Sequence, residues 1–180
     1  MPTGAVAACE GAAGMKILVA AVGDVFLGDA GFGVEVVRRI RAEGALPDGV
    51  ELTDAGGGLH LAYRLLNGYD VLVLLDLLRG EDPPGTLYTL EHDLDARPET
   101  APPPDGRSMD PTAVLDLLDG LAGSMGVARP VGRVLVIGCE PARLDEQIGL
   151  SPPVAAAVAP AARAVRELVT DLVRQQATRS

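Results

Sequence analysis

The sequence contains no tryptophan, and aromatic residues account for only 3% of its 180 residues. Its hydrophobic content of 48% is still enough for a sizeable core, which we expect to consist mainly of leucine, valine and alanine. A chain of this length fits a single domain. We assign that domain to residues 15–176. We interpret residues 1–14 as a disordered N-terminal extension, or as the product of an upstream translation start with Met15 as the older start.

Cysteine is also scarce. The two cysteines, Cys9 and Cys139, are too few for a disulfide framework, so a reducing cytosol is the expected compartment. No apolar run reaches the roughly 18 residues of a membrane-spanning helix, and the N-terminus lacks the basic segment of a signal peptide. The net charge of −10 argues against nucleic acid and anionic membranes as partners. We therefore expect a cytoplasmic monomer.

Several catalytic signatures are missing. There is no G-x-S-x-G elbow, and Ser108, Ser124 and Ser151 have no histidine nearby in the sequence. Cys139 has no histidine placed in sequence to activate it, so we interpret it as inert. An alternative interpretation is a nucleotide-binding α/β domain with Asp54 as the ribose-binding acid. The main evidence for such a domain would be a G-x-G-x-x-G motif after the first strand, and this motif is missing.

Apolar runs alternate with amphipathic segments along the chain. We predict strands over residues 16–22, 50–53, 69–75, 85–90 and 133–138, and helices over residues 33–43, 59–66, 110–125 and 151–175. This order predicts a three-layer α/β/α domain with a mostly parallel five-stranded sheet. The strand over residues 85–90 follows its predecessor too closely for a parallel crossover, so we expect it to be antiparallel. Pro160 is expected to kink or restart the last helix.

Aspartates follow three of the predicted strands. Asp24 and Asp29 come after the first, Asp54 after the second and Asp76 after the third. Because the carboxyl ends of parallel strands meet at one edge of a sheet, these side chains are candidates for a shared site. Aspartate also caps helices and closes turns, an alternative that applies above all to Asp24 and Asp54. Asp76 follows an apolar run, and a half-buried charge there needs a partner.

Six short motifs occur in a fixed order between residues 15 and 173. They are GDVFLGDAGFGV from Gly23, Asp54-Ala55-Gly56, Leu75-Asp76-Leu77 with Pro84-Gly85-Thr86, Met109-Asp110-Pro111, Gly138-Cys139-Glu140-Pro141, and Gly149-Leu150-Ser151-Pro152. In this order they resemble the motifs of the [NiFe]-hydrogenase maturation proteases. The resemblance implies an endopeptidase that removes the C-terminal tail of a hydrogenase large-subunit precursor after nickel insertion, with the nickel in the substrate as recognition element.

The resemblance also assigns roles to individual residues. It implies Asp29 and Asp76 as catalytic residues, and Asp54, Gly56, His60 and Asp110 as substrate-binding residues. The acidic, proline-rich segment over residues 91–107 is expected to form a surface loop at the border of the tail-binding cleft.

This sequence departs from the metal-ligand pattern of the family that it resembles. The three ligands of that pattern map onto Ala30, onto Asp76, and onto Arg107, or onto Asp110 if the more common spacing sets the register. Ala30 has no ligand atom, and Arg107 is a permanent cation that would repel a metal. Zn or Cd is expected to occupy such a site in vitro, with no metal at all as the alternative. Substitute ligands to consider are Asp29, Asp110, His60 and His92.

These substitutions leave a second reading open. A relative that has lost its chemistry would bind the precursor without cleaving it and act as an assembly chaperone or scaffold. Such a protein would bind the precursor tail in a metal-independent way.

Overall fold

The computed structural model describes residues 14–55, 57–95, 111–126, 128 and 131–179. Strands and helices alternate along the chain in the predicted order. The elements are β1 (Ile17–Val22), the 3-10 helix η1 (Gly28–Gly31), α1 (Phe32–Glu43), β2 (Val50–Ala55), α2 (Gly58–Leu65), β3 (Tyr69–Leu77), β4 (Leu87–His92), α3 (Pro111–Ser124), β5 (Val131–Cys139) and α4 (Pro152–Arg179). The expected extension, apart from Gly14, and residues 96–107 of the expected surface loop lie outside the described residues.

The five strands form one sheet in the order β2-β1-β3-β5-β4. Strands β1, β2, β3 and β5 are parallel, and β4 is antiparallel to β5. The predicted α/β class, the mostly parallel sheet and the antiparallel strand are therefore confirmed. Although only a short connection joins β3 to β4, the two strands are not neighbours, because β5 lies between them.

The connection between β3 and β4 crosses the end of β5 and is hydrogen bonded to it. The N–H of Leu78 donates to the carbonyl of Cys139 at 3.0 Å, and the N–H of Gly85 donates to the carbonyl of Glu140 at 2.8 Å. Gly85 has a positive φ and lies against Pro153 of α4, whose carbonyl oxygen a Cβ at this position would hit. The connection is thus fixed against both β5 and the start of α4.

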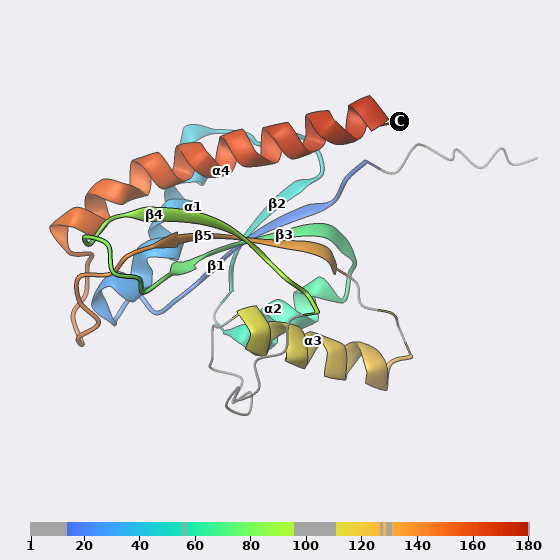
Figure 1. The fold of residues 1–180 in the computed structure, drawn as a ribbon, viewed down its shortest axis with the longest axis horizontal. Helices are drawn as coiled ribbons and strands as arrows, with labels where there is room; N and C mark the ends of the chain where they lie inside the picture. Colours follow the sequence, from blue (N-terminus) through green and yellow to red (C-terminus); the bar gives the residue numbers. More distant parts are fainter. Residues whose placement is uncertain (1–13, 56, 96–110, 127, 129–130, 180) are drawn as a thin grey trace, which may run out of the picture.

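Helices α1 and α4 cover one face of the sheet, and α2 and α3 cover the other (Figure 1). The side chains of β1 alternate between these layers: Val19 and Ala21 pack with α1 and α4, whereas Ala20 and Val22 pack with α2 and α3. Strand β1 is buried along its whole length, which explains its uninterrupted apolar run. None of the helices in the described parts of the chain has the length and apolar content that crossing a membrane requires.

Helix α4 is continuous past Pro160, so the prediction that this proline restarts the helix is wrong. Pro160 itself is exposed, whereas Ala157, Ala161 and Val165 on either side of it are buried. Packing of that face against the sheet outweighs the hydrogen bond that proline removes. The helix also extends to Arg179, beyond its predicted end.

Two glycines allow the backbone to pack closely around the end of β1. A Cβ at Gly33 would lie 2.5 Å from the carbonyl oxygen of Leu75, so α1 rests directly on β3. A Cβ at Gly23 would collide with the carbonyl oxygen of Ala30. The turn after β1 therefore folds back and places η1 against the end of that strand.

Candidate active site

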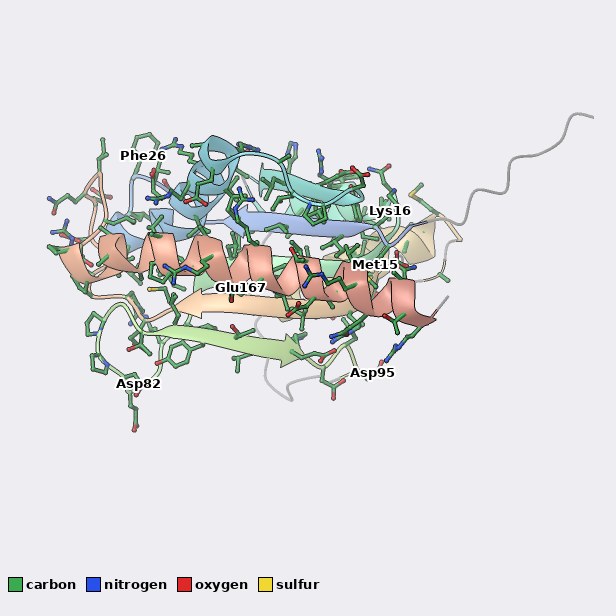
Figure 2. The ribbon with its side chains drawn as sticks, turned by 90° about the horizontal axis from the view of Figure 1, so that it is seen from above. Met15, Lys16, Phe26, Asp82, Asp95 and Glu167 are labelled. Carbon is green, nitrogen blue, oxygen red and sulfur yellow. The ribbon has the colours of Figure 1, made fainter. Side chains whose placement is uncertain are left out.

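The loops that follow β1, β3 and β5 gather at one end of the molecule, on the left in Figure 1. The register explains this arrangement, because Val22 pairs with Ala55 and Leu77 pairs with Cys139, so the parallel strands end at nearly the same level. Figure 2 shows Phe26 and Asp82 at this end, with Met15 and Lys16 at the other. The predicted convergence of strand-end residues at one edge is therefore confirmed at the level of the backbone.

The two strand-end aspartates Asp54 and Asp76 lie on opposite faces of the sheet. Asp54 pairs with Ala21, whose side chain faces α1 and α4, and the Asp54 carboxylate lies 3.5 Å from Arg41 of α1. Asp76 follows Leu75, which faces that same layer, so alternation directs Asp76 to the layer of α2 and α3. The structure does not bring these two carboxylates together.

Asp76 lies near the end of the central strand β3 and is half-buried. Its Oδ1 atom accepts a hydrogen bond from the N–H of Leu77 at 2.7 Å. On one side it is in register with Gly138 of β5, a glycine whose open flank is filled by the side chain of Leu78. Asp76 is therefore a carboxylate set into a largely apolar strand end, as the sequence predicted.

Asp24 closes the turn after β1. Its Oδ1 atom accepts a hydrogen bond from the N–H of Phe26 at 2.8 Å, two residues further along the chain. This is the turn-closing role that the sequence left open for Asp24.

Asp29 is completely buried, and its carboxylate accepts four hydrogen bonds from the loop after β5. Oδ2 accepts the N–H groups of Ala142 at 2.8 Å and Arg143 at 2.9 Å, and the hydroxyl of Ser151 at 2.9 Å; Oδ1 accepts the N–H of Ser151 at 2.7 Å. Burial alone would raise the pKa of this carboxyl, but the hydrogen bonds from Ser151, Arg143 and Ala142 outweigh it and lower the pKa. Asp29 therefore ties the turn after β1 to the loop between β5 and α4.

Backbone contacts reinforce this tie. The N–H of Gly28 donates to the carbonyl of Gln147 at 2.7 Å, and the N–H of Asp29 donates to the carbonyl of Arg143 at 3.2 Å. Leu27 and Gln147 form an isolated parallel bridge. The two loops behave as one structural unit at the carboxyl edge of the sheet.

Glu140 attaches the β3–β4 connection to the end of β5. Its Oε2 atom accepts the N–H of Gly80 at 2.6 Å and lies 2.9 Å from the hydroxyl of Tyr88, which lies 2.8 Å from Asp82. Partial removal from water, followed by the contacts with Asp82 and Glu140, raises the pKa of Tyr88 well above its ordinary value. The sequence pointed to Glu140 only as part of the Gly138-Cys139-Glu140-Pro141 motif and assigned it no role of its own.

Cys139 is buried, and its thiol points into the layer of α1 and α4. Burial, together with the negative charges of Asp29 and Glu140, raises the pKa of this thiol to about 11. A protonated, inaccessible thiol is a poor nucleophile. The structure thus supports the interpretation of Cys139 as inert.

The tips of the two loops joined by Asp29 expose large apolar side chains. Phe26 is 64% exposed and Ile148 is 75% exposed. Leu27, next to Phe26, and Leu144, four positions before Ile148, are also exposed. A groove of about 580 Å³ adjoins these loops between α1 and α4, lined in part by Val25, Leu150 and Val158. Apolar side chains gathered in this way on a surface are typical of a region that binds another molecule.

Residues 34–168 match the family model described as hydrogenase maturation protease. The chain belongs to the hydrogenase maturation protease family. It is 30% identical over 152 residues to the hydrogenase 2 maturation protease of Escherichia coli (strain K12), covering 82% of this chain and 86% of that protein. It is 33% identical over 156 residues to the hydrogenase expression/formation protein HupD of Rhodobacter capsulatus, covering 85% of this chain and 71% of that protein.

A solved structure agrees with this assignment. The hydrogenase maturating endopeptidase HybD from E. coli superposes with a TM-score of 0.66 and 26% identity, covering 87% of this chain and 93% of HybD. The expectation that this sequence is a hydrogenase maturation protease, drawn from its motifs, is therefore confirmed.

The structure describes only some of the positions onto which the resemblance maps metal ligands. Ala30 is half-buried in η1 and offers no ligand atom, whereas Asp76 is present near the end of β3. Arg107 and Asp110 lie outside the described residues, as does Gly56. Among the described residues, no group of three histidine, cysteine, aspartate or glutamate side chains could hold a metal. The described side chains therefore do not fit a resident metal with three protein ligands.

Of the two histidines considered as substitute ligands, His92 lies away from Asp76 along the sheet. His92 ends β4, four residues beyond Tyr88, whose partner Gly138 is in register with Asp76. At about 3.3 Å per residue, His92 lies roughly 13 Å along the strand from the level of Asp76. His60 is exposed on α2, which covers the face of the sheet to which Asp76 belongs. The register thus separates His92 from Asp76.

Proposed function

We propose that this protein removes the C-terminal tail from the large-subunit precursor of a [NiFe] hydrogenase. The observation that carries the proposal is the family match over residues 34–168, with Asp76 set into the carboxyl edge of the sheet. The buried free thiol of Cys139 and the net charge of −10 support a cytoplasmic enzyme that acts as a monomer on a protein substrate, without nucleic acid or membrane as partner.

Asp76 is the proposed catalytic carboxylate. A half-buried aspartate at a strand end can accept a proton from an attacking water or bind a cation that the substrate presents. In this proposal the nickel belongs to the precursor, and Asp76 faces it as a contact of the enzyme with a filled substrate. This suits a chain whose described residues offer no complete set of metal ligands.

Asp29 is proposed to act indirectly. All four hydrogen bonds to its carboxylate come from the loop between β5 and α4, and the side chain is inaccessible. Its role in this proposal is to position that loop beside Asp76. Asp54, Gly56, His60 and Asp110 remain proposed substrate-binding residues, with Asp54 on the other face of the sheet from Asp76.

The apolar loop tips are proposed as the docking surface for the folded part of the precursor. Phe26, Leu27, Leu144 and Ile148 belong to loops that follow β1 and β5, the same edge of the sheet at which β3 presents Asp76. A precursor held at these tips would therefore lie next to the proposed catalytic residue. The hydrogen bonds of Asp29 hold the two loops together before binding, so little conformational freedom is lost when the precursor binds.

A second candidate function rests on Ala30. Because this position cannot ligate a metal, a non-cleaving protein that binds the precursor as an assembly chaperone or scaffold is also consistent with the described residues. Such a chaperone would use the same docking surface but would not cleave the peptide bond.

The deciding experiment mixes the purified protein with its nickel-loaded precursor and follows the masses of both products by mass spectrometry. The shortened large subunit and the released tail are the expected products. If the precursor binds in gel filtration but keeps its full mass, the protease assignment is wrong and the chaperone assignment is supported. A precursor that neither binds nor shortens would contradict both.

A further inference from the structure

A second, smaller pocket lies at the same edge of the sheet. It has a volume of about 280 Å³ and is formed by the start of the β3–β4 connection and the loop after β5. Its lining is mostly polar and consists of Arg79, Gly80, Glu140, Pro141, Ala142, Arg143 and Leu144. Arg79 follows Asp76 by three residues, so its Cα lies within about 11 Å of that of the proposed catalytic residue.

Arg143 contributes a buried donor that lacks an acceptor. Its Nε atom is buried and has no hydrogen-bond partner among the described residues. The carboxylate of Asp145 lies 3.8 Å from this nitrogen, too far for a hydrogen bond. A buried guanidinium N–H without an acceptor carries a desolvation penalty. In native structures, an ordered water or a bound ion is a usual partner of such a group.

The backbone of Arg143 is fixed in place. Its N–H donates to Asp29 at 2.9 Å, and its carbonyl accepts the N–H of Asp29 at 3.2 Å. The side chain therefore extends from a fixed backbone. Because the loop is already ordered, a ligand would not have to order it on binding, which lowers the entropic cost of binding.

The hydrogen-bond donors of the pocket that are not already engaged limit the class of ligand that it can bind. The N–H groups of Ala142 and Gly80 are already bonded to Asp29 and Glu140. Arg79 is exposed and makes no hydrogen bond or ion pair among the described residues. Glu140 brings one negative charge into the lining, but its Oε2 atom is engaged by Gly80 and Tyr88. The charged donors of the lining are thus two guanidinium groups, that of Arg79 and that of Arg143, of which Arg143 is ion-paired only loosely with Asp145 at 3.8 Å.

We propose that this pocket binds a carboxylate of the precursor tail through Arg143 and Arg79. Guanidinium groups bind carboxylates with paired, charge-assisted hydrogen bonds. The carboxylate comes from an acidic side chain of the tail or from its free C-terminus, since both present the same group. This inference rests on the proposed function, because it names the part of the same substrate that is read beside Asp76.

The test measures binding of a labelled synthetic tail peptide by fluorescence anisotropy. Three peptides are compared: the natural tail, the tail with an amidated C-terminus, and the tail with its acidic side chains changed to amides. The proteins are the wild type, Arg143→Gln, Arg79→Gln and Arg143→Lys, with Arg163→Gln as the control. Arg163 is exposed on α4 and makes no hydrogen bond or ion pair among the described residues. Thermal unfolding confirms that each variant is folded.

The wild type is expected to bind the natural tail at least about tenfold more tightly than one of the neutralised tails, which then identifies the source of the carboxylate. Arg143→Gln should lose this preference, Arg143→Lys should keep part of it, and Arg163→Gln should keep all of it. Equal binding of all three peptides, a preference that survives in both Arg143→Gln and Arg79→Gln, or no binding of any peptide overturns the inference.

The cleavage assay, run on the same proteins, separates this inference from the proposed function. If the wild type leaves the precursor intact but binds the tail through Arg143, the protease assignment fails and the carboxylate pocket stands. If the wild type cleaves the precursor and Arg143→Gln cleaves it with unchanged KM, the protease assignment stands and the pocket is wrong.

Discussion

Ser151 donates two hydrogen bonds to the buried carboxylate of Asp29, one from its backbone N–H at 2.7 Å and one from its hydroxyl at 2.9 Å. These residues are 122 positions apart in the sequence, yet they join the turn after the first strand to the start of the last helix. Ser151 is itself buried and precedes Pro152, the first residue of α4. The pair therefore fixes two of the loops at the carboxyl edge of the sheet.

Replacing Asp29 with asparagine should destabilise the protein. The amide nitrogen would face N–H donors that now bind a carboxylate oxygen, and we expect a loss of about 2–4 kcal/mol in the free energy of unfolding. Urea denaturation measures this loss. Asp48→Asn is the control, because Asp48 is exposed and makes no hydrogen bond or ion pair among the described residues. Equal midpoints for the two variants would show that the Asp29 contacts contribute little.

Asp29 also predicts how stability depends on pH. Its folded-state pKa is lowered from the ordinary value of 3.8, so its contribution is complete above that value and is lost as the pH falls toward the folded-state pKa. The unfolding free energy of the wild type should therefore fall more steeply than that of Asp29→Asn when the pH is lowered from 5 through the ordinary carboxyl range. Parallel pH curves for the two proteins would contradict this assignment.

Asp76→Asn should abolish the processing of the precursor. Loss of a carboxylate that accepts a proton or contacts the substrate cation lowers rates by about 100-fold or more. Cleavage is followed by mass spectrometry, and precursor binding by gel filtration. Asp82→Asn serves as the control, an exposed aspartate in the neighbouring connection. Unchanged cleavage by Asp76→Asn would remove Asp76 from the proposed site.

The double substitution Ala30→Glu with Arg107→His should increase the affinity for Ni²⁺ or Zn²⁺. It supplies a carboxylate and an imidazole at the two positions where the resembled ligand pattern is broken. Isothermal titration calorimetry of both proteins measures the change, and Ala30→Gln with Arg107→Gln provides a matched pair without the ligand charge. No gain over the wild type would count against the mapping of Ala30 and Arg107.

Phe26→Ser combined with Ile148→Ser should raise the KM for the precursor about tenfold and leave kcat largely unchanged. These side chains are exposed, so their loss should barely affect folding. Met125→Ser is a suitable control, since Met125 is 63% exposed, close to the 64% of Phe26, and follows α3 rather than the carboxyl edge. A KM that stays constant in the double variant would remove the loop tips from the docking surface.

Local patterns were sufficient to predict most of the fold. The apolar run of β1 and the Ser151-Pro152 helix start each determine structure over a few neighbouring residues. Pro160 was misjudged because the packing of α4 against the sheet is a tertiary effect. The partner of β4 was likewise decided by β5, a strand that follows it in the sequence.

The site was harder to predict for the same reason. The sequence brought Asp54 and Asp76 to one edge but gave no register, and the register places them on opposite faces. The four hydrogen bonds of Asp29 come from residues more than a hundred positions away, so no local pattern could reveal them. The G-C-E-P motif at residues 138–141 was the one signal that pointed toward Glu140.

The strand order limits how a peptide tail can approach Asp76. In the sheet formed by the described residues, the edge strands are β2 and β4, and β3 is flanked on both sides by β1 and β5. Many peptide-binding proteins add the bound segment to a free sheet edge as an extra strand. Here neither free edge is next to β3, so a tail that reaches Asp76 must cross the strand ends and cannot extend the sheet. Its recognition then depends on side chains and loops rather than on a ladder of main-chain hydrogen bonds.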